Sequence, residues 1–326
     1  MDPRLRGDDG AYEVSSGLTM HTSNLVAVIV ATLIAATPLI YAALGELVVE
    51  RSGVLNLGVE GMMLVGAVTA FAVGVESGSL MLGYLAAIVA AVILSLIFGF
   101  LTLTLQTNQV ATGLALTLFG IGLSAFAGRS FAGMPIEGVP ALDIPLLGDL
   151  PVIGGIFHVD VLVYGAIALY FALDWFLKRT RAGLRLRAIG ESPTVAHAVG
   201  QRVIPIRYLA VMFGGATSGI AGAYLSTALT PMWVEGLSAG RGWIALALVV
   251  FATWKPLRVL LGAYLFGGVT VLQLHAQGFG LAVPSEILSM LPYVATIVVL
   301  VIICRDPKTI LLNQPASLGK SFHPDN

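Results

Sequence analysis

A carboxamide and a carboxylate stand at the start of an apolar run, in the stretch 50–67, ERSGVLNLGVEGMMLVGA. Asn56 and Glu60 are four residues apart, so on a helix they would share one face. A charged side chain at membrane depth costs about 2.5–3.5 kcal/mol on insertion scales and usually faces the bundle interior or a water-filled path. We therefore expect a polar stripe that lines a permeation path or steers a break in the helix. The alternative is that both side chains only anchor the helix at the membrane surface.

Glycines accompany this polar pair and return in a second segment. Three glycines within 53–61 favour irregular backbone, which a membrane tolerates only beside a cavity or buried in protein. Glu60-Gly61 and Arg241-Gly242 both begin an apolar run, and the similar phrases LMLGYL and LLGAYL follow them. The two runs have opposite predicted directions, as in an inverted repeat whose interface holds the substrate. The alternative to a repeat is chance similarity between two Leu- and Gly-rich segments. We place Glu60, Gly61, Arg241 and Gly242, together with Asn56, in the predicted translocation path.

A third candidate lies in a basic connection, residues 178–207, which holds seven of the 17 Lys and Arg residues. Ser192 can cap a helix that has Pro193 at its first position. Small residues follow from Thr194, and Gly200 can end the helix. A short, capped helix in a basic loop has the shape of a docking element. The alternative is an ordinary loop helix whose basic neighbours hold the chain to anionic lipid.

The composition identifies the surroundings in which these residues work. Residues of the set AVILMFWYC make up 57% of the 326 residues and charged residues only 11%, with a mean hydropathy of +0.92. A soluble domain carries about 25% charged residues, so this is an integral membrane protein. The net charge of −1 excludes a generally basic nucleic-acid binder. A single cysteine and scattered histidines predict no disulfide scaffold and no metal site, and we expect no catalytic residues.

Stretches free of Asp, Glu, Lys and Arg mark the elements that must position these residues. Because these stretches are continuously apolar and do not alternate, they exclude a transmembrane β-barrel. We predict an all-α, polytopic membrane helix bundle of about eight to ten transmembrane helices, each of about 20 residues. The candidate spans are 24–44, 54–75, two within 77–128, 159–177, 207–228, 243–254, 257–275 and 285–304. The segment 243–254 is shorter than a full crossing, so it either uses flanking residues or is a half-helix.

The distribution of basic residues predicts the orientation and the domain boundaries. Lys and Arg favour the cytoplasmic side, so the basic connection is predicted to be cytoplasmic. Residues 1–23 are predicted to be a polar tail, which is disordered or, if translation starts at Met20, not translated. Residues 24–305 form the predicted membrane domain. The tail 306–326 is predicted to be cytoplasmic, and its LGKS phrase lacks the other parts of a phosphate-binding loop.

Three separated motifs together resemble one family. They are ERSGVLNLGVEGMMLVGA (50–67), LRLRAIGESPTVAHAVG (184–200) and GRGWIALALVVFATWKPL (240–257). They are similar to the permease subunit of bacterial ATP-binding-cassette (ABC) importers, in the branch for branched-chain amino acids, simple sugars and nucleosides. The resemblance covers residues 24–312. The phrase SGVLNLGVEGMM is closest in wording to permeases of nucleoside or purine uptake systems.

The resemblance implies a mechanism, partners and a location. Within the loop 178–206, the coupling residues that it implies are Ile189, Gly190, Glu191, Ser192, Pro193, Thr194, Ala196 and Gly200. They would dock into a cytoplasmic ATPase subunit that binds ATP and Mg²⁺, so the permease itself needs no cofactor and is not an enzyme. The expected partners are two ATPase subunits, a second permease, identical or paralogous, and an extracytoplasmic binding protein. The expected location is the bacterial cytoplasmic membrane. The alternative function is an ion-coupled secondary transporter without an ATPase partner.

Overall fold

The computed structural model describes residues 9–142, 154–278 and 313–323, together with single positions between 284 and 301. Across these residues the chain is helical, and its extended pairings are isolated bridges between loop residues. Seven helices in the described part are long and apolar enough to cross a membrane. The predicted all-α membrane bundle is therefore confirmed. The predicted span 285–304 lies mostly outside the described residues.

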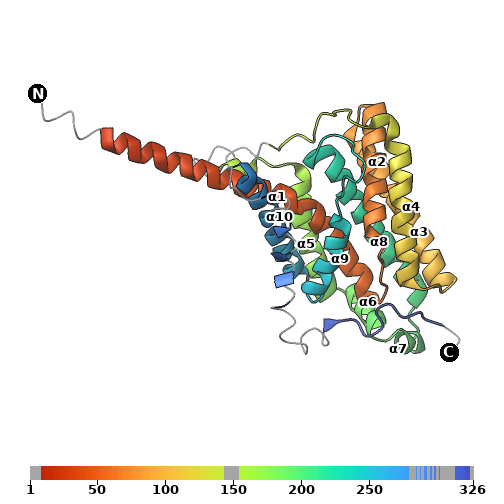
Figure 1. Cartoon of the computed structure of the whole chain (residues 1–326). Coiled ribbons are helices and arrows are strands. Elements are labelled where there is room, and N and C mark those ends of the chain that lie inside the picture. Colours follow the sequence, from red (N-terminus) through yellow and green to blue (C-terminus); the bar gives the residue numbers. More distant parts are fainter. Residues whose placement is uncertain are drawn as a thin grey trace, which may run out of the picture.

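The helices follow the chain in the order shown in Figure 1. Their bounds are α1 Asp9–Arg51, α2 Val59–Ser77, α3 Leu80–Gly99, α4 Gln109–Gly128, α5 Val161–Arg179, α6 Arg181–Glu191, α7 Pro193–Ala198, α8 Val203–Tyr224, α9 Arg241–Phe251 and α10 Pro256–Gly278. Short π-helical turns extend α3 and α8 as far as Thr104 and Leu229. Two 3-10 turns, Arg129–Phe131 and Gly154–Phe157, lie between α4 and α5.

Polar residues in the short turns decide where the helices begin. The side chain of Asn108 accepts a hydrogen bond from a first-turn amide of α4 (3.0 Å). Asp160 does the same for two first-turn amides of α5 (2.9 and 3.1 Å). These side chains satisfy amides that have no partner within their own helix. The two spans predicted within 77–128 therefore correspond to α3 and α4.

The bundle has two halves that make equivalent contacts: two helices of each half pack on one helix of the other half. Helices α1 and α8 contact each other; α2 and α3 pack on α8, whereas α9 and α10 pack on α1. Small residues allow the close approach: a Cβ on Gly219 of α8 would lie 2.7 Å from a carbonyl oxygen of α3. A Cβ on Gly267 of α10 would lie 2.9 Å from backbone atoms of α1. These reciprocal contacts support the predicted inverted repeat, with α1–α3 in one half and α8–α10 in the other.

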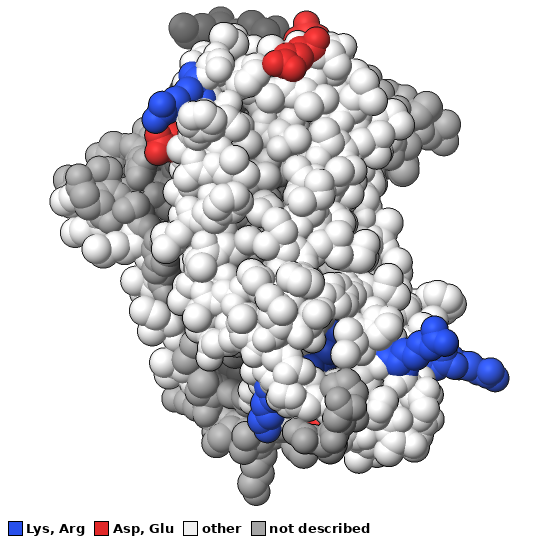
Figure 2. Space-filling model, turned by 90° about the vertical axis from the view of Figure 1, so that its right-hand side faces the viewer, with Lys and Arg blue, Asp and Glu red and all other residues white. Residues whose placement is uncertain are grey.

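The two ends of the bundle differ in charge. Helices α6 and α7 and the C-terminal residues lie at the bottom of Figure 1; we call this the basic end because it carries the basic connection 178–207. Figure 2 shows a broad band without charged side chains between the charged groups of the two ends, as expected for a lipid-facing surface. From Asp9, helix α1 extends beyond the bundle. The domain boundary at residue 23 and translation from Met20 stay predictions.

Candidate functional site

The connection between α1 and α2 brings the first predicted pair into the interior of the protein. Helix α2 begins only at Val59, so Asn56 lies in the nonhelical connector of residues 52–58 and does not share a helical face with Glu60. The Asn56 side chain accepts a hydrogen bond from the Gly58 amide (2.9 Å), and the backbone amide of Asn56 donates to the Glu46 carboxylate (3.2 Å). Asn56 is fully buried. The helical-face argument was wrong because the glycines end α1 and delay α2.

Glu60 binds the N-terminus of α9. One carboxylate oxygen accepts hydrogen bonds from the Ser238 hydroxyl (2.5 Å) and the Gly240 amide (3.0 Å), and the other accepts from the Gly242 amide (2.5 Å). Only 4% of Glu60 is exposed. A negative charge at this position satisfies unpaired amides and is stabilised by the helix dipole. Glu60 therefore acts as the N-terminal cap that α9 does not obtain from its own residues.

Both glycines of the predicted path serve close packing at this place. A Cβ on Gly242 would lie 2.6 Å from the Cα of Glu60, and one on Gly61 would lie 2.8 Å from the Cα of Thr117 in α4. Arg241 donates hydrogen bonds to the carbonyl oxygens of residues 237 and 238. The structure thus brings Glu60, Gly61, Arg241 and Gly242 together. We call the meeting of α2 and α9 at Glu60 and Gly242 the half-helix junction.

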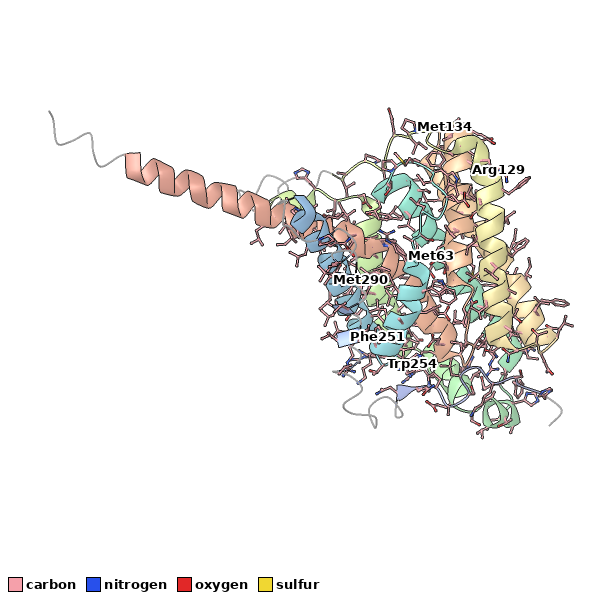
Figure 3. All side chains as sticks on the ribbon, in the orientation of Figure 1. Met63, Arg129, Met134, Phe251, Trp254 and Met290 are labelled. Atoms are coloured by element: carbon pink, nitrogen blue, oxygen red, sulfur yellow. The ribbon has the colours of Figure 1, made fainter. Side chains whose placement is uncertain are left out.

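The junction lies inside the bundle. Figure 3 places Met63, one helical turn after Glu60, between Arg129 at the opposite end and Trp254 at the basic end. Helix α9 has 11 residues, which span about 16 Å and cannot cross a hydrocarbon core of about 30 Å. The half-helix interpretation of 243–254 is therefore confirmed. Interrupted helices that meet within the membrane are typical of transporter binding sites; lining of the path by these residues stays a prediction.

Two further buried acids were missed from the sequence. Glu50 accepts a hydrogen bond from the ring N–H of Trp254 (2.5 Å), and the backbone carbonyl of Trp254 accepts two from Arg51 (2.8 and 3.2 Å). Glu46 and Glu50 are each only 1% exposed. Both acids lie beyond residue 44, where the first span was predicted to end. Their i, i+4 spacing within a continuing helix was the signal that could have identified them.

The basic connection forms two helices where one was predicted. Ser192 caps α7 by accepting from the Val195 amide (3.4 Å), Pro193 occupies the first turn, and Gly200 has φ 81° just after the helix. These features confirm the predicted short helix, which spans Pro193–Ala198. Helix α6 before it was not predicted. Thr180 caps α6 through the amide of Gly183 (3.0 Å).

The predicted coupling residues divide between the interior and the surface. Ile189, Gly190 and Ala196 are buried against the permease itself. Glu191, Thr194 and Gly200 are exposed, whereas Ser192 and Pro193 are half-buried. The exposed face also includes two apolar side chains that were not predicted, Val195 (62%) and Val199 (69%). These two valines are one helical turn apart, so they form a small apolar face on the basic end.

The described residues contain no group of three or more His, Cys, Asp and Glu placed to hold a metal ion. The LGKS phrase of the tail forms a turn in which Gly319 has φ 73°. Its amide donates to the carbonyl of Gly53 (3.2 Å). This amide therefore serves a contact within the chain.

An interrupted-helix junction inside an apolar bundle, with a capped helix at the basic end, is the architecture of a transport permease. The model of the family described as branched-chain amino acid transport system / permease component matches residues 28–302, and the chain belongs to this family. It is a multi-pass inner-membrane permease subunit of an ATP-driven importer. The family's members are not themselves enzymes, and membership implies ATPase and substrate-binding partners in general.

Similar proteins extend over most of the chain. The putative glucose ABC transporter permease protein TsgC13 of Haloferax volcanii is 41% identical over 90% of this chain and 96% of its own. The guanosine ABC transporter permease protein NupQ of Bacillus subtilis is 34% identical over 84% and 90%. The nucleoside ABC transporter permease protein NupC of Lactococcus lactis subsp. cremoris is 33% identical over 86% and 93%. No solved structure matches the chain.

Proposed function

We propose that this chain, together with a second permease subunit, forms the translocation path for a nucleoside or a related small polar solute. The names of its relatives specify guanosine, nucleosides and glucose, solutes that share hydroxyl groups and a sugar ring. The half-helix junction at Glu60 and Gly242 supports the location of the path, because it places helix ends and irregular backbone at depth in the bundle. The proposed path residues are Asn56, Glu60, Gly61, Arg241 and Gly242.

The observation that carries the coupling to ATP is the exposed face of α7. A helix of six residues contributes little stability by itself, yet it is capped at both ends and presents Val195 and Val199 outward. These two neighbouring apolar side chains, exposed at a polar end, support an interaction site there. An ATPase subunit docks on this face, binds ATP and Mg²⁺ itself, and leaves the permease without a cofactor. A binding protein delivers the solute to the opposite end.

Reconstitution tests this function. The permease, the second permease subunit and the ATPase are reconstituted together in proteoliposomes. The binding protein is added on either side of the membrane, and labelled guanosine, adenosine, uridine or glucose is supplied. We expect uptake of one nucleoside that requires both ATP and the ATPase. Uptake of the same solute by the permease alone, driven by an ion gradient, would contradict the proposal. Uptake of glucose but of no nucleoside would retain the ATP-driven mechanism and correct the substrate.

Replacement of one apolar side chain tests the docking face separately. Val195→Asp places a charge where an apolar contact is proposed, so co-purification of the ATPase should fall by about tenfold or more, as at an interface hot spot. Ser321→Asp, also exposed at the basic end, is the control and should retain the ATPase. Equal recovery of the ATPase with the two variants would place the docking surface elsewhere.

A further inference from the structure

Residues 313–323 lie across the basic end and join elements that are distant in the sequence. In Figure 1 they run beside α6 and α7 toward the C-terminus. At their start, the carbonyl of Asn313 accepts a hydrogen bond from Arg51 at the end of α1 (3.1 Å). Near their end, the carbonyl of Phe322 accepts one from Gln106, in the turn between α3 and α4 (3.1 Å). We call residues 313–323 the C-terminal strap.

The centre of the strap fills a gap between α6 and the α1–α2 connector. Ser317 donates hydrogen bonds to the carbonyl of Gly190 from both its amide (3.0 Å) and its hydroxyl (2.7 Å). The Gly319 amide donates to the carbonyl of Gly53 in the connector (3.2 Å). Gly53 and Gly190 are themselves so close that a Cβ on Gly53 would lie 3.4 Å from the Cα of Gly190. The strap therefore binds both sides of one tight backbone contact.

A buried arginine joins the strap and the connector to α8. Arg207, at the start of α8, is only 1% exposed. Its guanidinium donates to the carbonyl of Ser52 in the connector (3.1 Å), and to the hydroxyl of Ser317 (3.1 Å) and the carbonyl of Lys320 (3.4 Å) in the strap. A buried guanidinium is costly unless its donors are used. Loss of the strap would leave most of these donors without a partner.

The end of the strap packs directly under α7. Phe322 is only 7% exposed and belongs to one apolar cluster with Ile189, Ala196 and Val203. Its ring meets the ring of His197 edge to face, with centroids 5.7 Å apart. Ala196 is the buried residue of α7, so Phe322 is a principal part of the surface on which α7 rests.

From these contacts we infer that the C-terminal strap is the mechanical link between α7 and the half-helix junction. It makes α6, α7 and the connector 52–58 move as one body when the partner ATPase displaces α7. The connector leads directly to Glu60, which binds the N-terminus of α9, so displacement of the connector reaches the junction. The inference rests on the proposed docking of an ATPase at α7, and it assigns a coupling role to a tail that the sequence left without one.

The test separates ATP hydrolysis from transport. Ser317→Ala removes the hydroxyl that joins Gly190 and Arg207, and Phe322→Ala removes the support of α7; the double variant is assembled with the complete importer. Ser321→Ala, in the same strap and exposed, is the control. We expect ATP hydrolysis to continue while solute transported per ATP hydrolysed falls by at least about fivefold, as for loss of a coupling energy. An unchanged ratio would overturn the inference. Absence of ATP-driven uptake in the wild type would instead reject the proposed function.

A cross-link between the strap and the connector provides an independent test. A Cβ on Gly319 would lie 4.0 Å from the Cβ of Leu55, within the range of a disulfide. Leu55→Cys with Gly319→Cys, in a Cys304→Ser background, should therefore oxidise to a disulfide. Because the strap and the connector are inferred to move together, the oxidised importer should keep the transport ratio of the same variant after reduction. Failure of the disulfide to form, or reversible loss of transport on oxidation, would overturn the inference.

Discussion

Glu60 is a carboxylate that accepts its hydrogen bonds from backbone amides and a hydroxyl. Its two oxygens receive hydrogen bonds from Ser238, Gly240 and Gly242, the arrangement of an acid at a helix N-terminus. The residue therefore has a structural role in holding α2 and the half-helix α9 together, whether or not solute passes it. Because Glu60 is hydrogen-bonded to the N-terminus of α9, any movement of that helix end changes these hydrogen bonds.

Glu60→Gln tests this role. The amide side keeps one acceptor but places an NH₂ group against donors, so we expect a loss of about 1–3 kcal/mol in stability. Thermal unfolding of the detergent-purified protein measures the effect as a lower Tm. Glu235→Gln makes the same chemical change at an exposed site in the loop before α9 and should leave the Tm unchanged. Equal Tm values for the two variants would argue against the capping role.

Gly190 offers a second residue-scale prediction. A Cβ at this position would overlap the carbonyl oxygen of Arg51 and approach the amide of Gly53, so Gly190→Ala should cost about 1–3 kcal/mol through overpacking. Gly122→Ala is the matched control, because nothing lies within 4 Å of a Cβ there and alanine favours the helix. Tm measurements of both variants check the expectation. A Gly190→Ala variant as stable as Gly122→Ala would show that α6 can move away from the connector.

At the scale of elements, α9 is a half-helix tied at both ends by acids of the other half of the molecule. Glu60 of α2 binds its N-terminus, and Glu50 of α1 binds Trp254 just after its C-terminus. Thr253 and Trp254 have φ values of 49° and 53°, a conformation that is costly for residues other than glycine. The contacts with α1 stabilise this turn and so fix where α9 ends.

Trp254→Phe should loosen the C-terminal attachment of α9. Phenylalanine keeps most of the packing but leaves the buried Glu50 carboxylate without its ring N–H donor, at a cost of about 1–3 kcal/mol. Trp243→Phe, the same substitution at the start of α9 where 38% of the side chain is exposed, serves as control. Comparison of the two Tm values provides the measurement. If Trp254→Phe were no less stable than Trp243→Phe, the hydrogen bond to Glu50 would not hold α9.

At the scale of the whole molecule, the separation of charges predicts which end faces the cytoplasm. In a Cys304→Ser background, Ser321→Cys at the basic end and Glu235→Cys at the opposite end are both exposed. A membrane-impermeant maleimide applied to spheroplasts should label Glu235→Cys alone, because the basic end is predicted to lie inside. Lysis should expose Ser321→Cys to the reagent as well. The reverse order of labelling would invert the orientation.

The whole molecule also shows why one part of the site was predicted well and another was not. Composition and span length predicted the bundle, because they report only which solvent surrounds each segment. The capped α7 was predicted because Ser192, Pro193 and Gly200 act through their own backbone neighbours. The repeat placed Glu60 and Gly242 in one predicted path, but the hydrogen bond between them joins residues 182 positions apart, and no local rule predicts that contact.

By itself, the sequence determined that this protein is a helical membrane permease with a short capped helix at its basic end, since apolar runs, caps and motif wording are local properties. Tertiary structure decided which acids are buried, that Asn56 lies outside α2, and that the C-terminal tail is a strap under α7. Burial depends on what packs against a residue, and the partners of Glu46, Glu50 and Ser317 come from other helices. The free energy of a buried polar group is therefore a property of the fold, whereas the membrane preference of a span is a property of its residues.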